Sequence, residues 1–143
     1  MADSQSLKLL FVSRGVYDAV STHVLGCLQA QGYADLSLAS LQFLGALDCG
    51  INYASEIARQ LGVSRQMVAK TVKELSELGY LSQASGVGKQ KVILYTLRGE
   101  HLIARVRQIL ADLDQRLIQQ IETRDLTLLL SQLTAIQDIL QHK

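Results

Sequence analysis

A helix-turn-helix pattern in residues 52–81 constrains the fold of this chain more than any other stretch. Ile57 and Leu61 have helical spacing, and Gly62 follows them as a residue that tolerates a positive φ and so can end a helix. Ser64 is then placed to cap a second helix, because its hydroxyl can accept from free backbone N–H groups of the next turn. A helix, a turn with glycine and a second helix together form the helix-turn-helix motif.

The second predicted helix has an apolar face that would pack against the rest of the motif. Its apolar residues recur at steps of three and four, and Gly79 follows them as a stop. The inward stripe consists of Val68, Val72, Leu75 and Leu78. The opposite face is therefore expected to be exposed.

That outward face carries side chains suited to a DNA major groove. An Arg can fork to O6 and N7 of guanine and a Gln can pair with N6 and N7 of adenine, so Arg65 and Gln66 are candidate base readers. Lys70 and Lys73 are better suited to phosphates. The candidate set on this helix is Ser64, Arg65, Gln66, Ala69, Lys70 and Lys73. The alternative is an ordinary solvated helix face, because such residues decorate most surface helices.

A β-hairpin is predicted directly after the second helix. Residues 80–82 read as a short strand, residues 85–91 as a turn and residues 92–97 as an apolar, β-branched return strand. Two strands after a recognition helix form a wing, and Lys89 and Lys91 near its tip would reach the DNA backbone or minor groove. The alternative is an exposed hairpin with two solubilising lysines.

Several motif positions occur in order along this stretch: Ser55-Glu56-Ile57-Ala58, Gly62-Val63-Ser64-Arg65, Leu75, Gly79-Tyr80-Leu81 and Thr96-Leu97-x-Gly99. This series, with the chain length and the long helices after Gly99, resembles the MarR family of bacterial transcription regulators. The resemblance implies a homodimeric winged helix-turn-helix protein, more often a repressor, that binds an inverted-repeat operator. It also implies release from DNA by a small-molecule effector.

The sequence departs from the family pattern at three places. The wing is short and has no Asp-x-Arg element. Tyr53 stands where the family usually has a Thr that caps the first helix of the motif, so Asn52 or Ser55 is expected to take over the capping. Arg98 and Gly99 occupy the start of the segment after the wing, where a proline is common.

Long apolar helices are predicted on both sides of the motif. They cover residues 6–30, 36–47 and 98–122, and a last apolar stripe runs to the C-terminus after an interruption at Thr123-Arg124-Asp125. With 48% hydrophobic and only 19% charged residues, part of the apolar surface is expected to be buried against a second copy. The alternative is an intramolecular helix cluster in a monomer.

The predicted fold is therefore mainly α with a small β-hairpin wing, a winged helix-turn-helix inserted in a helical dimerisation frame. Residues 1–35 and 99–143 form the dimerisation region, and residues 36–98 form the DNA-binding domain. Between Arg59 and Lys91 there are six basic residues against two acidic ones, a net charge of +4 in a chain whose total is +1. Basic charge thus concentrates where the DNA would lie.

Ligand and redox roles have weaker sequence support. Tyr17, His23 and Tyr33 could line an effector pocket, although each residue type is more often found in a core or an interface. A redox-sensing thiol needs a lowered pKa and access. Cys27 lies among leucines, and Cys49, beside Gly50 in a turn, is the better candidate.

Other classes of function are disfavoured. The three histidines are scattered without a nucleophile or carboxylate at motif spacing, and the two cysteines lack zinc spacing, so neither an enzyme, nor a metal site, nor a cofactor is expected. No signal peptide and no membrane span is expected, which predicts a cytoplasmic protein. A winged helix that binds a protein partner instead of DNA is the remaining alternative.

Overall fold

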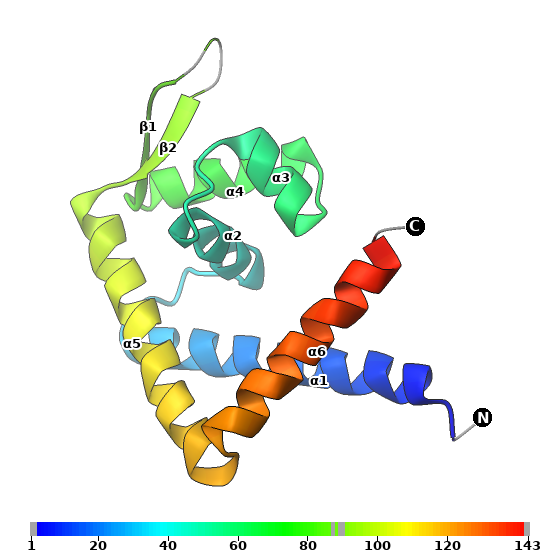
Figure 1. Cartoon of the computed structure of the whole chain (residues 1–143). Helices are drawn as coiled ribbons and strands as arrows, with labels where there is room; N and C mark the ends of the chain where they lie inside the picture. The colour runs from blue at the N-terminus through cyan, green and yellow to red at the C-terminus, as the bar shows by residue number, and fades with distance from the viewer. Residues whose placement is uncertain (1–2, 87, 89–90, 142–143) are drawn as a thin grey trace. The chain divides into compact units, whose positions relative to one another are not determined.

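The computed structural model describes residues 3–86, 88 and 91–141. Within these residues it has six helices and one two-stranded antiparallel sheet (Figure 1), which confirms the predicted mainly α fold with a hairpin. The elements are α1 (Gln5–Ala30), α2 (Leu38–Asp48), α3 (Ala54–Leu61), α4 (Arg65–Glu77), β1 (Leu81–Ser85), β2 (Lys91–Tyr95), α5 (Leu97–Gln120) and α6 (Thr123–Gln141). None of the helices in the described residues is long and apolar enough to cross a membrane.

The chain divides into two compact units, Met1–Arg107 and Gln108–Lys143. The first unit contains α1 to α4, the hairpin and the first part of α5. The second unit contains the rest of α5 and all of α6. Apart from Ile109, the buried apolar side chains of the described residues lie in the first unit, where Phe43, Leu44 and Ile57 are among the largest fully buried ones.

The first two helices begin at serine caps. The Ser4 hydroxyl accepts from the Leu7 backbone N–H at 3.2 Å, and the Ser37 hydroxyl accepts from the Ser40 N–H at 3.2 Å. Only the C-terminal part of α1 is buried. Its earlier turns expose Leu7, Leu10, Phe11, Val12, Val16, Tyr17 and Val20.

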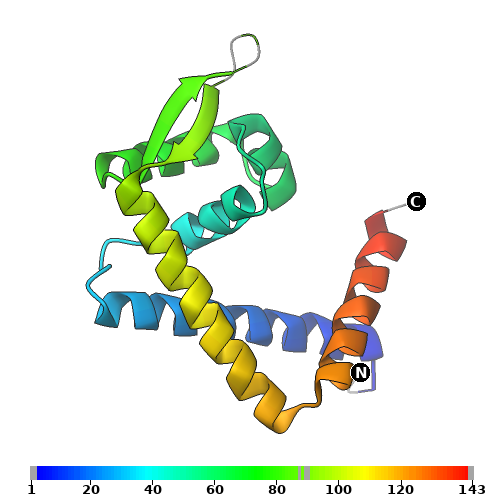
Figure 2. The ribbon, with the colours of Figure 1, turned by 60° about the vertical axis from the view of Figure 1, so that its left-hand side comes forward.

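The helix-turn-helix forms as its local sequence predicts. Gly62 has φ 67° at the end of α3, a left-handed conformation that glycine adopts without steric cost. The Ser64 hydroxyl accepts from the Met67 backbone N–H at 3.1 Å and caps α4. Figure 2 shows α3, α4 and the hairpin together on one side of the first unit.

The predicted cap of α3 was wrong. The N-cap residue is Tyr53, whose side chain makes no capping bond. Asn52 is unsuited to the role because its carbonyl oxygen accepts from the Ile93 backbone N–H at 2.9 Å, which holds it against β2. Ser55 lies inside the helix, which begins at Ala54.

The hairpin has a simple register, in which Leu81 pairs with Tyr95 and Ser85 with Lys91. The first strand begins one residue later than predicted. The return strand ends at Tyr95 rather than at residue 97, because Thr96 caps α5 instead of extending the strand. The Gly99 backbone N–H donates to Thr96 Oγ1 at 3.0 Å.

The break between the last two helices lies slightly before the predicted one. Ile121 and Glu122 are outside both helices, and Thr123 already belongs to α6. The Glu122 carbonyl accepts from the Leu126 N–H at 3.0 Å, which places residues 123–125 in the first turn. In α6, none of residues 123–141 is buried, and several large apolar side chains are exposed: Leu128, Leu129, Leu130, Ile139 and Leu140.

Candidate nucleic-acid interface

Helix α4 has one buried and one exposed face, as its periodicity predicts. The buried face consists of Val68, Thr71, Val72 and Leu75. Every helix residue of the predicted DNA-binding set lies on the exposed side: Ser64, Arg65, Gln66, Ala69, Lys70 and Lys73. The structure therefore leaves this surface open to a partner.

The core of the first unit holds α4 in place through α2. A small gap of about 20 Å³ among α2, α3 and α4 has a lining that includes the apolar side chains of Phe43, Leu61 and Val68. The buried Thr71 hydroxyl is satisfied within the helix, because it donates to the Met67 carbonyl at 3.1 Å. The exposed face thus stands on a packed and hydrogen-bonded base, which limits the freedom of the helix to reorient.

Two clefts flank the exposed face of α4. One of about 370 Å³ lies on the α3 side and is lined by Ser55, Glu56, Ala58, Arg59, Val63 and Arg65. The other, of about 500 Å³, lies toward the hairpin and is lined by Ala54, Ala69, Val72, Lys73, Ser76, Glu77 and Gln83. Arg59 on α3 and Gln83 on β1 were not among the candidates predicted from the sequence, which came from the second helix and the tip of the wing. The only sequence signal for Arg59 was its place in the basic segment.

The wing contributes one described cation. Lys91 is exposed at the first residue of β2, opposite Ser85. Lys89, the other predicted wing contact, lies outside the described residues. The described residues of the predicted set therefore come from α4, its N-cap and β2, all in the first unit.

Comparisons with known proteins agree with this architecture. No protein-family model matches the sequence, and no curated protein matches it. Solved structures do. A MarR/EmrR family transcriptional regulator from Acinetobacter sp. ADP1 is 14% identical with a TM-score of 0.79, and the match covers 98% of this chain and 99% of that one. A MarR transcriptional regulator from Methanosarcina mazei Go1 is 13% identical (TM-score 0.76, covering 94% and 90%). MepR from S. aureus, solved as a DNA complex, is 17% identical (TM-score 0.74, covering 91% and 96%).

The chain has the MarR-type winged-helix fold. At these identities the likeness establishes the fold, and the roles of individual residues depend on the geometry of this chain.

A clasp at Thr96 joins the base of the wing to the start of α5 in this MarR-type fold. The Thr96 N–H donates to the Tyr80 carbonyl at 3.0 Å, and the Thr96 hydroxyl donates to the Gly79 carbonyl at 2.5 Å. A Cβ atom at Gly99 would collide with the Tyr80 carbonyl oxygen, so the approach of α5 to Tyr80 requires glycine there. The Arg98 guanidinium lies 4.9 Å from the centre of the Tyr80 ring. These contacts fix the position of the base of the hairpin relative to the C-terminal end of α4.

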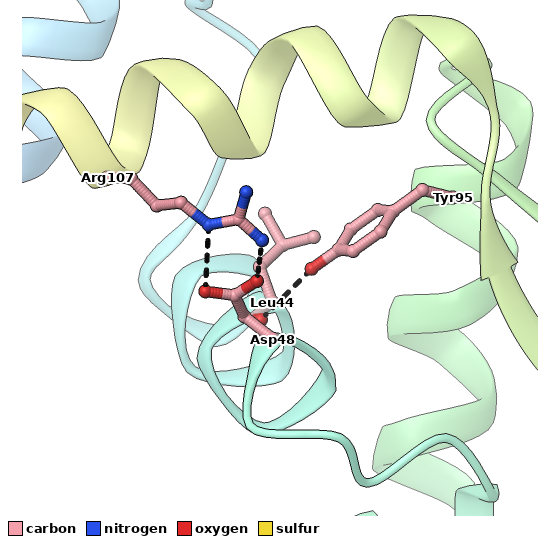
Figure 3. Close-up of polar contacts among 4 residues, drawn as sticks. All are labelled: Leu44, Asp48, Tyr95 and Arg107. Carbon is pink, nitrogen blue, oxygen red and sulfur yellow. Dashed lines mark hydrogen bonds and ion pairs between the residues drawn. The ribbon is translucent and has the colours of Figure 1, made fainter.

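A second connection joins the hairpin to α2 and α5 (Figure 3). The Tyr95 hydroxyl donates to the Leu44 carbonyl at 3.4 Å, and the Arg107 guanidinium donates to both carboxylate oxygens of Asp48. Burial, helped by the negative charge of Asp48, raises the pKa of Tyr95 to about 12. The hydrogen bond to Asp48 raises the pKa of Arg107. The ion pair is largely exposed, so it contributes little to stability by itself.

The three candidate ligand residues have different partners in this fold. Tyr17 bonds to the Gln42 side-chain amide, His23 Nε2 lies 3.8 Å from Cys27 Sγ, and the Tyr33 ring packs against Tyr80 with 6.4 Å between centroids. These contacts do not bring the three side chains to a common point. Their predicted role in effector binding stays a prediction.

The two thiols differ in environment. Cys49 caps the end of α2 and is exposed, whereas Cys27 is half-buried and contacts His23. Both are free thiols. Among the described residues there is no group of three or more His, Cys, Asp or Glu side chains that could hold a metal ion.

Proposed function

We propose that this chain is a transcription regulator that binds double-stranded DNA as a homodimer. The observation that carries the proposal is the exposed face of α4, whose polar and basic side chains stand on a buried, capped helix within a MarR-type fold. A helix of this width fits the DNA major groove. The proposal gives the winged helix-turn-helix, residues 36–98, the DNA-binding role.

The residues of α4 have distinct proposed roles. Gln66 is at the first turn, where it can pair with an adenine edge, and the Ala69 methyl group can contact a thymine methyl group. Lys70 and Lys73 are placed one and two turns after Gln66, on the same face, and contact phosphates. Ser64 caps the helix and so sets the direction of its first turn. Lys91 adds a contact from the wing to the DNA backbone.

The terminal helices supply the proposed dimer interface, which comprises residues 1–35 and 99–143. Large apolar side chains are exposed there to an extent unusual for a monomer, with Phe11 at 66%, Val12 at 64% and Ile139 at 72%. A second copy of the chain is the partner that buries them. A two-fold dimer then presents two copies of α4 to the duplex, and half-sites about 34 Å apart form an inverted repeat.

Repression and release complete the proposal. A dimer on such an operator blocks a promoter, and a small molecule releases it if that molecule binds better to the dimer conformation whose spacing does not fit the operator. Tyr17, His23 and Tyr33 remain the candidate ligand contacts. Support for this step comes from the resemblance to the MarR family.

A binding titration on the upstream region of the protein's own gene tests the proposal. Lys70→Ala is expected to weaken binding and flatten its salt dependence, since a phosphate contact is lost. Gln60→Ala truncates an exposed, uncharged side chain of α3 and serves as the control, because it removes no phosphate-binding charge. Binding that responds weakly to salt and is unchanged in Lys70→Ala would favour the alternative of a winged helix for protein contacts.

Thiol-based regulation is a second candidate function, favoured by the environments of the two cysteines. Cys49 is exposed, which meets the need of a sensing thiol for access, and Cys27 Sγ lies 3.8 Å from His23 Nε2. Peroxide treatment followed by the same titration tests this candidate. Loss of DNA binding that Cys49→Ser or Cys27→Ser prevents would support it and identify the thiol, whereas unchanged binding of the oxidised protein would exclude it.

A further inference from the structure

The cleft on the α3 side of the helix-turn-helix is a candidate anion site. We propose that Arg59 and Arg65, which line this cleft, hold a phosphate of the DNA backbone. The inference rests on the proposed DNA-binding function and assigns to it a site that extends from Arg65 on α4 to Arg59 on α3. It also gives Arg65 a role different from the guanine contact that its residue type suggested.

The geometry brings two arginines from different elements to one hollow. Arg59 belongs to α3 and Arg65 to the first turn of α4, and both line the cleft of about 370 Å³ together with Ser55 and Glu56. Both arginines are exposed. Arg65 is also one position away from the outward row of Gln66, Lys70 and Lys73, whose steps of four and three mark a single face.

The charges of the cleft favour an anion. In the part of the chain that the structure describes, neither guanidinium takes part in an ion pair. Two guanidinium groups without an ion-pair partner line one hollow, so a bound anion can interact with both of them. The Glu56 carboxylate also lines the cleft and opposes the anion, so the net charge of its side chains is +1. A guanidinium suits phosphate in particular, because its forked N–H groups match two phosphate oxygens.

The position of the cleft identifies the source of the phosphate. When the second helix of a helix-turn-helix lies in the major groove, the first helix crosses the DNA backbone. Helix α3 is that first helix, and the cleft lies between it and the start of α4. A phosphate at the edge of the groove therefore reaches Arg59 and Arg65 while Gln66 faces the bases.

Affinity measured against salt concentration tests the site in the full-length protein, with one duplex obtained by selection and one unrelated duplex. Arg59→Gln and Arg65→Gln are each expected to weaken binding about tenfold on both duplexes and to reduce the salt slope by about one. Glu56→Gln is expected to tighten binding, since it removes the opposing charge. Gln60→Ala truncates an exposed, uncharged side chain of α3 that does not line the cleft, and it should leave the slope unchanged.

Three other results would refute the phosphate contact, its assignment to DNA, or the proposed function itself. An unchanged salt slope in Arg59→Gln, or a loss confined to the selected duplex, would refute the phosphate contact. If Arg59→Gln abolished binding of inorganic phosphate to the DNA-free protein but left the salt slope intact, the site would belong to a small anion rather than to DNA. If the unmodified protein bound neither duplex, the proposed function itself would fail.

Discussion

Replacing Gly99 by alanine tests the clasp that joins the wing to α5. An added Cβ atom would be 3.0 Å from the Tyr80 carbonyl carbon, 3.2 Å from Tyr95 Cδ1 and closer still to the Tyr80 carbonyl oxygen. All of these distances are tight, and the nearest atom belongs to the backbone, which cannot rotate away. The start of α5 must therefore move away from Tyr80 in the variant, which strains the bonds made by Thr96.

The expected change in the free energy of unfolding is the balance of one gain and two costs. Alanine is more favourable than glycine inside a helix by up to about 1 kcal/mol. Overpacking costs about 1–3 kcal/mol, and loss of the Thr96 cap costs about 1 kcal/mol more. Gly99→Ala is therefore expected to lower the free energy of unfolding by about 1–3 kcal/mol.

Gly45→Ala is the matched control, because a Cβ atom at this exposed position of α2 would meet nothing within 4 Å. It is expected to raise the free energy of unfolding by about 0.4–1 kcal/mol. Urea unfolding followed by circular dichroism measures both variants. The protein concentration must be held constant, because the stability of the proposed dimer would depend on it. A Gly99→Ala protein as stable as the unmodified one would refute the reasoning.

Two further predictions concern the same region. Thr96→Val keeps the β-branched shape but removes the hydroxyl that caps α5 and donates to the Gly79 carbonyl, so we expect a loss of about 1–2 kcal/mol in the same urea assay, with Thr96→Ser close to the unmodified protein. An equal loss in both variants would contradict the cap. Burial raises the pKa of Tyr95 from 10.0 to about 12, so in this range the folded state keeps a proton that the unfolded state has lost. The resulting stability is present below pH 10 and lost as the pH rises toward 12, and Tyr95→Phe is expected to flatten that decline in urea midpoints. Identical pH profiles for the two proteins would contradict it.

The helix-turn-helix could be predicted because its signals are local. Gly62 supplies the left-handed turn and Ser64 the cap, and both act within one turn of the chain. The exposed face of α4 follows from the same helical period. These features need no knowledge of tertiary contacts.

The predictions of the α3 cap and of the end of the return strand were wrong because contacts between residues far apart in the sequence determine both. Asn52 is a good capping residue by type, but its carbonyl is engaged by Ile93, more than forty positions away in the chain. Thr96 has a β-branched side chain typical of strands, yet its hydroxyl completes a cap next to Gly79. Residue type alone cannot separate these uses.

The same limit applies to the candidate site. Arg59 and Arg65 are on different helices, and only the packing of α3 against α4 shows that they share a cleft. The sequence prediction took Arg65 as a base reader from its residue type on one helix, without the neighbour that α3 provides. Gly99 was recognised as part of a motif, but the reason for glycine, the close approach of Tyr80, was visible only in the structure.

Selection of bound sequences from random DNA by the purified protein, followed by hydroxyl-radical footprinting of the selected duplex, tests the central claim most directly. The account predicts an inverted repeat, with two protected patches on one face of the duplex about one helical turn apart. It also predicts that Gln66→Ala relaxes the preference at one base pair of each half-site. Recovery of no common sequence, or of an asymmetric site with a single protected patch, would contradict it.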